Sequence, residues 1–234
     1  MRHKMASISQ RLRLPTICSL CNQHHRSRLA ICAACHQHLK PIGPACYHCA
    51  LPLPTNDFLI CGYCCKKKPY VDQTVAACRF EEPLRTLLHE FKYHEGLYLC
   101  SFLATLILDA IPPGAEKTQC LIPVPMHYKR LRQRGFNQAA ELAKQLGKTL
   151  KLPYDLYRCK KIRNTPPQAS LDARQRQKNL HDAFLAAPIP YQHITLVDDL
   201  ITTGNTVNEL AKLLKMQGVD RVDVWCCAKA VILP

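Results

Sequence analysis

Two adjacent aspartates, Asp198 and Asp199, are the residues whose spacing points most directly to chemistry. They follow the apolar run 194–197, which predicts a buried strand, and they precede the hydroxyl-rich segment 202–206, which contains Gly204. Ligands of open α/β sheets bind at the carboxyl ends of strands. Adjacent carboxylates can accept hydrogen bonds from two sugar hydroxyls, and backbone N–H groups at a helix N-terminus bind phosphate. The strand, the two aspartates and the segment 202–206 together predict a ribose 5-phosphate site. The alternative is an ordinary strand-turn-helix in which Asp and Thr only cap the helix.

The other chemical signal is a series of four Cys-x-x-Cys pairs within residues 1–68. This spacing turns two thiolates toward one ion, and two such pairs make the tetrahedral S₄ site that suits zinc. No apolar run follows the basic start, so we expect no signal peptide and a cytoplasmic protein, whose clustered cysteines bind metal. We expect one or two structural Zn²⁺ ions, with the pairs combined in chain order: Cys18, Cys21, Cys32 and Cys35, then Cys46, Cys49, Cys61 and Cys64.

Other ligand sets stay open at this level. A cross-braced pairing is an alternative, Cys65 could replace Cys64, and four histidines lie nearby: His24, His25, His36 and His48. A redox role for one pair is a further alternative, against which the repetition of four pairs argues. Because thiolate in every position leaves no place for water, zinc here is expected to be structural rather than catalytic.

Composition divides the chain into residues 1–68, which hold the cysteine pairs, and residues 69–234, where long apolar periods appear. Helices are predicted at 82–96, 97–111, 136–150 and 203–217, and strands at 120–125, 193–199 and 221–230. Strands that alternate with helices predict an α/β fold with a parallel sheet and helices on both faces. No stretch approaches the ~18 apolar residues of a membrane span. We therefore expect a small Cys₄ zinc-ribbon module followed by one α/β domain.

The formal net charge of +15 makes a polyanion such as nucleic acid a plausible partner, although a solvated basic surface would have the same composition. Lys129, Arg130, Arg132 and Arg134 surround Gly135, directly after the predicted strand 120–125. They should lie at the same sheet edge as the aspartates, where arginine can hold pyrophosphate or a nucleic-acid backbone. A second basic segment, with two prolines, contains Arg163, Gln168, Arg174 and Arg176.

Two further residues have competing interpretations. Phe136 could offer a stacking platform for a base, but a core position against the following helix is favoured. Lys92 lies after a predicted helix beside Tyr93; it is either an ordinary surface lysine or, as the family resemblance described below implies, a residue near pyrophosphate.

The segment LVDDLITTGNT (196–206) resembles the diphosphoribose-binding motif of type I phosphoribosyltransferases. Together with IPVPMHYKRLRQRGFNQAAELA (122–143), RNTPPQASLDARQRQKNLHDAF (163–184) and the cysteine region, it makes nearly the whole chain similar to the ComF (ComFC) family of competence proteins, close to the GntX proteins. The resemblance implies a type I phosphoribosyltransferase-like sheet domain after a double zinc ribbon. One departure concerns Thr202: purine-salvage enzymes carry an aspartate there, so purine phosphoribosyl transfer is in doubt.

The resemblance implies roles residue by residue. Phosphoribosyl diphosphate, with Mg²⁺, is expected at Asp198, Asp199, Thr202, Thr203, Gly204, Asn205, Thr206, Lys92, Arg130 and Arg134. Nucleic-acid contacts are expected at Lys129, Arg132, Arg163 and Arg174.

Three functions are compatible with these features. The first, which the resemblance favours, is the handling of incoming single-stranded DNA in natural transformation, with a phosphoribosyl diphosphate or nucleotide in the transferase-like site. The second is an active phosphoribosyltransferase with an unknown acceptor. The third is a non-enzymatic adaptor whose zinc ribbons bind a DNA-processing protein.

Overall fold

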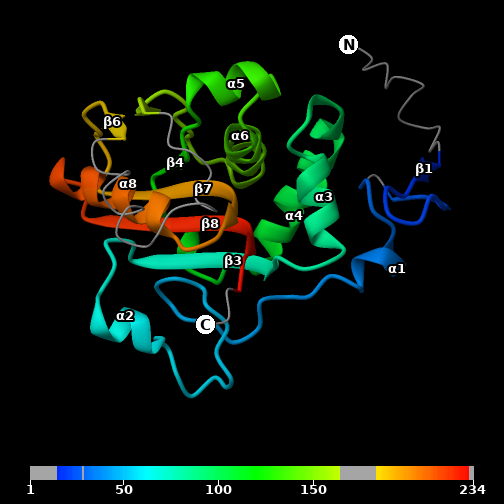
Figure 1. Ribbon diagram of the computed structural model, residues 1–234, viewed down its shortest axis with the longest axis horizontal. Coiled ribbons are helices and arrows are strands. Elements are labelled where there is room, and N and C mark those ends of the chain that lie inside the picture. The colour runs from blue at the N-terminus through cyan, green and yellow to red at the C-terminus, as the bar shows by residue number, and fades with distance from the viewer. Residues whose placement is uncertain (1–14, 28, 164–182, 232–234) are drawn as a thin grey trace, which may run out of the picture.

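The computed structural model describes residues 15–27, 29–163 and 183–231. The strands and helices in these ranges alternate along the chain (Figure 1). They are β1 Thr16–Ile17, β2 His24–His25, α1 Ala33–His36, α2 Gly62–Lys66, β3 Gln73–Arg79, α3 Leu84–Glu90, η2 His94–Leu99, α4 Cys100–Ala110, η3 Ala115–Lys117, β4 Cys120–Pro123, α5 Tyr128–Arg134, α6 Gln138–Leu150, β5 Cys159–Lys161, β6 Phe184–Ala186, β7 His193–Ile201, α8 Asn205–Met216 and β8 Arg221–Lys229.

The centre of the molecule is a four-stranded sheet in the order β3-β8-β7-β4, and every neighbouring pair is parallel. In register, Trp225 of β8 lies opposite Val75 of β3 and Val197 of β7, and Val197 lies opposite Pro123 of β4. Strand β8 is almost continuously buried and β7 is buried from Ile194 to Val197, as expected for strands covered on both faces. All four carboxyl ends consequently lie at one edge of the sheet.

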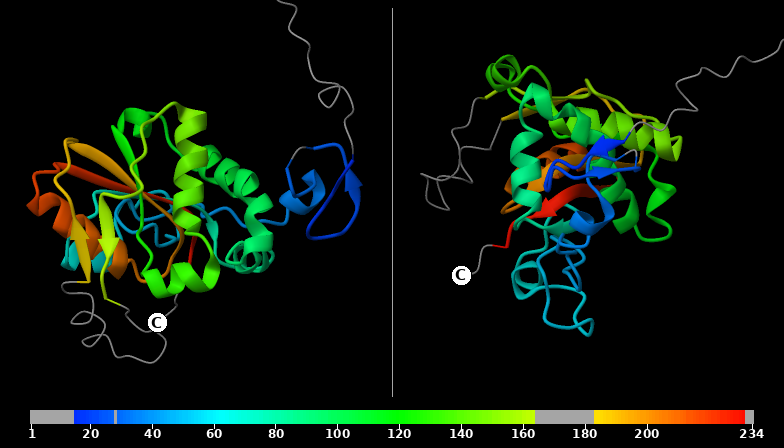
Figure 2. Two further views of the ribbon diagram at one scale, coloured as in Figure 1. Left: turned by 90° about the horizontal axis from the view of Figure 1, so that it is seen from above. Right: turned by 90° about the vertical axis from the view of Figure 1, so that its right-hand side faces the viewer.

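Helices cover both faces of this sheet, as Figures 1 and 2 show. On one face α4 packs on β3 and β8 while α6 packs on β4 and β7, and α8 packs on the other face. The first face is built around Trp225 with Leu103 and Leu142, and the second around Val224 with Leu210. The expected parallel α/β sheet with helices on both faces is therefore confirmed.

The element boundaries differ from the sequence expectations in several places. The helix predicted from Phe136 begins at Gln138, because Gly135 ends a separate helix, α5, with a left-handed φ of +82°. Strand β7 continues two residues beyond its predicted end at Asp199, to Ile201. Strand β3 was not predicted, since its sequence QTVAACR lacks a two-residue alternation and its interior is wholly buried. The segment 171–180, expected to form a helix or an ordered loop, lies outside the described residues.

The cysteine region is attached to the free edge of β3. The N–H of Arg79 donates to the carbonyl oxygen of Lys40 at 2.8 Å, that of Ile42 to Ala77 at 3.1 Å, and that of Thr74 to Tyr47 at 2.9 Å. Residues 40–47 therefore cover an edge that would otherwise expose unpaired backbone groups. This edge is one place where residues 1–68 and residues 69–234 share backbone hydrogen bonds.

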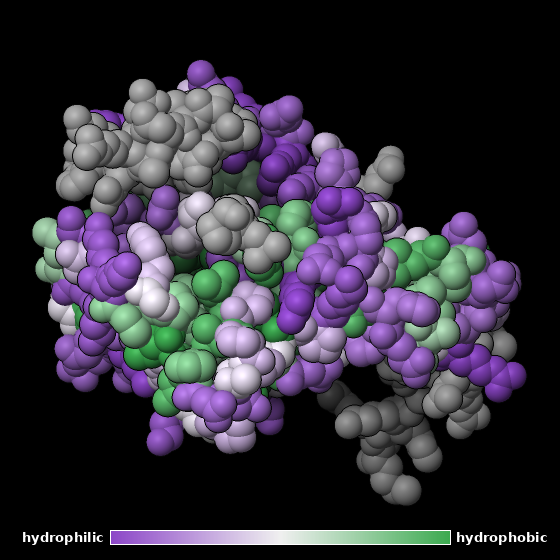
Figure 3. Space-filling view, turned by 60° about the horizontal axis from the view of Figure 1, so that its bottom comes forward, coloured by the Kyte–Doolittle hydropathy of each residue, from purple (hydrophilic) through white to green (hydrophobic). Residues whose placement is uncertain are grey.

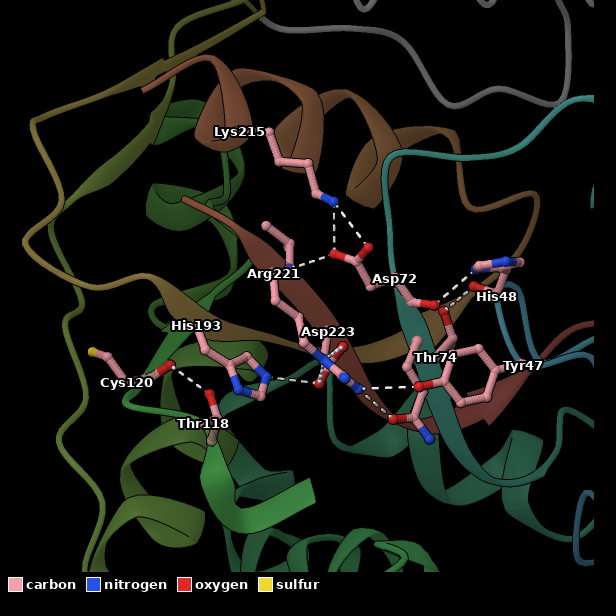
Figure 4. A network of polar contacts seen from close by, with 12 residues as sticks. Tyr47, His48, Asp72, Thr74, Thr118, Cys120, His193, Lys215, Arg221 and Asp223 are labelled. Carbon is pink, nitrogen blue, oxygen red and sulfur yellow. Dashed lines mark hydrogen bonds and ion pairs between the residues drawn. The ribbon is translucent and has the colours of Figure 1, made fainter. Parts of the chain in front are cut away.

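A polar network closes the amino-terminal end of the sheet (Figure 4). Asp223, 1% exposed, accepts hydrogen bonds from Arg221 Nε at 3.0 Å and lies 2.8 Å from His193 Nε2. Arg221 also donates to the hydroxyl of Tyr47 at 3.1 Å, and Asp72 accepts the N–H of Val222 at 2.8 Å. The network joins the cysteine region to β8 at the end of the sheet that lies opposite the aspartate pair.

Candidate ligand site and metal centres

Asp198 and Asp199 occupy the part of β7 that extends past its neighbour β4. The pairing of β4 with β7 ends at Val197, whereas β8 continues alongside, with Cys226 opposite Asp198. Both carboxylates are half-buried, and the N–H of Asp199 donates to Oδ1 of Asp198 at 2.9 Å. The pair therefore lies at the carboxyl edge of the sheet, where β7 extends beyond the end of the shorter strand β4.

The surroundings of Asp198 disfavour its ionised form. Burial raises the pKa of Asp198 well above its ordinary value, and the adjacent charge of Asp199 raises it further. Carboxyl groups whose surroundings shift the pKa in this way are concentrated at functional sites. A ligand that donates hydroxyls to these carboxylates, or brings a cation to them, would relieve it.

The segment after β7 lines a small, open hollow of about 40 Å³, whose walls are Asp198 and residues 200–207. Gly204 has a φ of +81°, a left-handed conformation that favours glycine, and it precedes the first residue of α8. Thr202 and Thr203 are exposed, and the N–H of Asn205 faces Oγ1 of Thr203 at 3.5 Å. Hydroxyls and the N-terminus of a three-turn helix together suit a phosphate.

A cationic side chain that the sequence interpretation missed, Lys161 of β5, lies beside this site. Burial lowers the pKa of Lys161, the charge of Arg130 lowers it further, and the charge of Asp198 opposes both. The charges of Arg130 and of Asp198 therefore both act on Lys161. The available signal was the strand alternation that puts Lys161 on the same side as the buried Cys159.

Arg134 and Lys92, both expected near pyrophosphate, are linked through Gln138. Arg134 Nη1 donates to Oε1 of Gln138 at 3.2 Å, and Nε2 of Gln138 donates to the carbonyl oxygen of Lys92 at 3.0 Å. Gln138 is 1% exposed, so this link is fixed within the protein. The structure therefore brings Arg134 and the backbone of Lys92 together through Gln138.

The residues expected to contact nucleic acid are on the surface where they are described. Lys129 and Arg132 are exposed on α5, and the guanidinium of Arg132 lies over the exposed ring of Tyr128, 5.8 Å from its centroid. Arg163 is also exposed, while Arg174, like Gln168 and Arg176, lies outside the described residues. Phe136 is 7% exposed and its ring centroid lies 6.0 Å from that of Phe91, so it is a core residue and not a stacking platform.

The eight cysteines form two groups in chain order, and within each group all Sγ atoms lie within 4.8 Å of one another. Cys21 and Cys32 approach to 3.8 Å between sulfurs, and Cys49 and Cys61 to 3.7 Å. A tetrahedral site with Zn–S bonds of about 2.3 Å has sulfurs about 3.8 Å apart, so both groups fit zinc. No cysteine of the chain is in a disulfide, and Cys65 is exposed outside the second group.

The molecule is thus an α/β protein with a hollow lined by carboxylate and hydroxyl groups at its sheet edge and with two tetracysteine groups. No family model matches the chain. It is 36% identical over 196 residues to competence protein F of Haemophilus influenzae, which covers 80% of this chain and 85% of that protein. It is 33% identical over 221 residues to the DNA utilization protein YhgH of Shigella flexneri, covering 92% of this chain and 91% of that protein. The chain belongs to this family of competence protein F and DNA utilization proteins.

Among solved structures, the chain is similar to orotate phosphoribosyltransferase from Aeropyrum pernix. The TM-score is 0.34 with 14% sequence identity, over 63% of this chain and 77% of that chain. A likeness this weak carries no argument about activity. Within the described residues, no helix combines the length and the hydropathy needed to cross a bilayer.

Proposed function

We propose that this protein handles single-stranded DNA in the cytoplasm during natural transformation, and that its sheet-edge hollow binds phosphoribosyl diphosphate. The relatives carry the names competence protein F and DNA utilization protein, which favours a role in DNA use. The observation that supports the ligand part is the hollow lined by Asp198 and by residues 200–207, which brings the Asp198 carboxylate and the N-terminus of α8 into one site.

The chain's own residues would divide the ligand between them. Asp198 and Asp199 accept the ribose hydroxyls, and the loop 202–206 holds the 5′-phosphate with its N–H groups and hydroxyls. Arg130 and Lys161 supply positive charge for the diphosphate. Mg²⁺, which prefers oxygen ligands, would accompany the diphosphate and neutralise part of its charge.

The ligand part is tested by calorimetric titration of 5-phosphoribosyl 1-diphosphate with Mg²⁺. Wild type should bind, and a variant with both Asp198→Asn and Asp199→Asn should bind at least ~10-fold more weakly while remaining folded. Because Asp223→Asn would alter a structural carboxylate, the matched control is Asp109→Asn at the surface end of α4. Equal binding by the double variant would refute the assignment.

The DNA part is tested by the salt dependence of single-stranded DNA binding. Each phosphate contact contributes about −0.7 to the slope of log K against log salt, so replacing Lys129 and Arg132 by Ala should flatten the slope by about 1.4. The control replaces two exposed lysines, Lys148 and Lys151, at the C-terminal end of α6, which is the end farther from α5 in the chain. If both double variants change the slope equally, α5 has no special role in DNA binding. If DNA binding by the wild type does not depend on salt, binding through basic side chains is refuted.

A further inference from the structure

Helix α5 differs from α3, α4, α6 and α8 because it buries none of its seven residues, all of which are described. A helix this short is not stable by itself, so it depends on its ends. At the start, Nδ1 of His127 accepts the N–H of Lys129 at 3.3 Å. At the end, the left-handed Gly135 donates its N–H to Leu131 at 2.8 Å. The fold therefore maintains a helix whose main contribution is the surface that it presents.

The side chains of α5 are divided between two faces. Arg130 and Arg134 are four residues apart and half-buried, and Arg134 donates to the buried Gln138. Tyr128 and Arg132 are also four residues apart, but both are exposed. Because successive residues of a helix are turned by about 100°, the two pairs lie on opposite faces. The proposed diphosphate site uses Arg130 of the inner face and leaves the aromatic ring of the outer face unexplained.

Tyr128 presents a fixed aromatic ring on this outer face. The residue is 55% exposed, and the guanidinium of Arg132 lies over its ring, 5.8 Å from the centroid, which is a cation–π distance. The ring of His127, which is only 4% exposed, lies 4.5 Å from the Tyr128 ring between centroids, at an angle of 43°. A buried neighbour and a cation thus hold the ring in place while it remains accessible to a ligand.

The charge around this ring selects an anionic ligand. Residues 117–140 contain no aspartate or glutamate, whereas α5 alone carries four cations. An acidic peptide would match that charge, but it would make no use of an exposed ring beside a guanidinium. A single nucleic-acid strand uses both, since every base has a π-face that stacks on an aromatic ring and every phosphate can pair with arginine. In Figure 1, α5 lies at the upper surface of the molecule, away from α2.

We propose that the outer face of α5 is a base-stacking site for single-stranded DNA, in which an unpaired base stacks on Tyr128 and Arg132 binds a neighbouring phosphate. The inference rests on the DNA part of the proposed function and deepens it. Contacts from Lys129 and Arg132 alone would hold any polyanion, whereas the ring of Tyr128 favours a strand whose bases are unpaired. Tyr128 thus takes the stacking role for which the buried Phe136 is unsuited.

The site is tested by titrating the full-length protein into a fluorescently labelled oligothymidylate at several salt concentrations. Tyr128→Leu should bind about 10-fold more weakly than wild type, the order of magnitude that one base–aromatic stack contributes. The loss should be the same at every salt concentration, because a neutral ring releases no counterions. Tyr128→Phe, which keeps the ring, should bind like wild type. The matched control, Tyr157→Leu, removes a tyrosine that is 79% exposed and should change nothing.

Two further ligands separate stacking from charge. An abasic oligonucleotide of equal length and a duplex both offer phosphates without unpaired bases, so wild type and Tyr128→Leu should bind each of them equally. A loss on the abasic strand as large as that on oligothymidylate would overturn the inference, because Tyr128 would then act without a base. Wild-type affinity of Tyr128→Leu for oligothymidylate, or an equal loss in Tyr157→Leu, would overturn it as well.

Failure of the proposed function gives a different result. Wild type would then show no salt-dependent binding of oligothymidylate, and the stacking site would be refuted with it. If wild type binds and Tyr128→Leu binds equally well, DNA binding stands and only the stacking site is refuted. Should Tyr128→Leu melt below wild type, Tyr128→Gln, which suits an exposed helical position, replaces it with the same expected results.

Discussion

Residues 16–39 and residues 46–66 each contain two Cys-x-x-Cys pairs with nearly the same spacing, yet they are attached to the sheet domain in different ways. In the first, Cys18, Ala30, Ile31 and Leu39 are part of the large hydrophobic cluster that includes α3 and α4. In Figure 1 this region projects at the α1 end of the molecule, beyond α3.

The second region is attached mainly by polar contacts. Its buried cysteines form a small cluster of their own, and the hydroxyl of Thr74 donates to the carbonyl oxygen of His48 at 2.6 Å. His48 Nδ1 lies 2.7 Å from the carbonyl oxygen of Asp72, and the N–H of Tyr70 donates to Asn208 of α8 at 2.6 Å. Figure 3, which turns the lower side of Figure 1 toward the viewer, shows hydrophobic side chains mixed with hydrophilic ones on that side.

This difference shows that the same cysteine motif can be attached to a domain either through apolar packing or through hydrogen bonds. The first group adds to the apolar core around α3 and α4, so its loss should destabilise mainly these two helices. The second lies at the edge of β3, so its loss should mainly affect the sheet. Four predictions test this contrast, from the largest expected effect to the smallest.

Loss of either metal centre should give the largest effects, and the pair Cys46→Ser and Cys18→Ser separates them. Each variant should lose one zinc and several kcal/mol of stability, because structural zinc contributes about 10 kcal/mol or more in small zinc-binding peptides. Hydrogen exchange should show lost protection at β3 in Cys46→Ser, and at α3 and α4 in Cys18→Ser. If Cys18→Ser exposes β3 as strongly as Cys46→Ser does, the two regions are not attached differently.

The apolar attachment of the first region predicts a large cost for Ile31→Ala. Ile31 is 2% exposed, and truncating a buried isoleucine costs about 2–5 kcal/mol. Denaturant unfolding measures the cost, with Ile17→Ala, at a residue 55% exposed, as the control expected to change little. Equal costs for the two variants would mean that the first region contributes little to the core.

The polar attachment of the second region predicts a smaller cost for Thr74→Val. Thr74 is 8% exposed, and the variant keeps the shape while it removes the donor to His48. Leaving a buried carbonyl without its partner costs about 1–3 kcal/mol. Thr149→Val, which removes an exposed hydroxyl bonded to Gln145 within α6, is the control in the same unfolding experiment. A change at Thr74 no larger than at Thr149 would argue against attachment through hydrogen bonds.

The smallest expected effect on stability lies at the ligand edge, where Asp198→Asn should stabilise the protein. Since the folded-state pKa of Asp198 is raised by burial and by Asp199, wild-type stability falls as pH rises from about 4 through that pKa. The variant lacks this loss, so its melting temperature should exceed that of wild type at pH 8 and match it near pH 3.5.

Asp155→Asn provides a control of opposite sign for this pH series. Its pKa is lowered because Arg158 and two backbone N–H groups outweigh its burial, so its contribution is present above about pH 4 and lost as pH falls through the folded pKa. Asp155→Asn should therefore destabilise at pH 8. Destabilisation by Asp198→Asn at pH 8 would show that the acidic pair supports the fold rather than a ligand.

Much of the candidate site could be predicted because its signals are local. Cys-x-x-Cys spacing, two adjacent aspartates after an apolar run and a glycine before a helix all act within a few residues of one another. The β3 strand was missed because a strand buried on both faces has no polar alternation, and Lys161 was missed because its importance depends on Arg130 and Asp198, which are distant in sequence.

The sequence by itself therefore determined the two cysteine groups, the alternating α/β pattern and the acidic pair with its loop, since short-range spacing dictates turns, caps and strand ends. Only the tertiary structure decided how each cysteine group is attached, and it alone brought Arg221 of β8 to the hydroxyl of Tyr47 in the cysteine region. The physical reason is that burial, and the charge compensation it demands, depends on which surfaces meet when the chain packs. Two cysteine motifs with nearly identical spacing can therefore pack against different surfaces of the same domain.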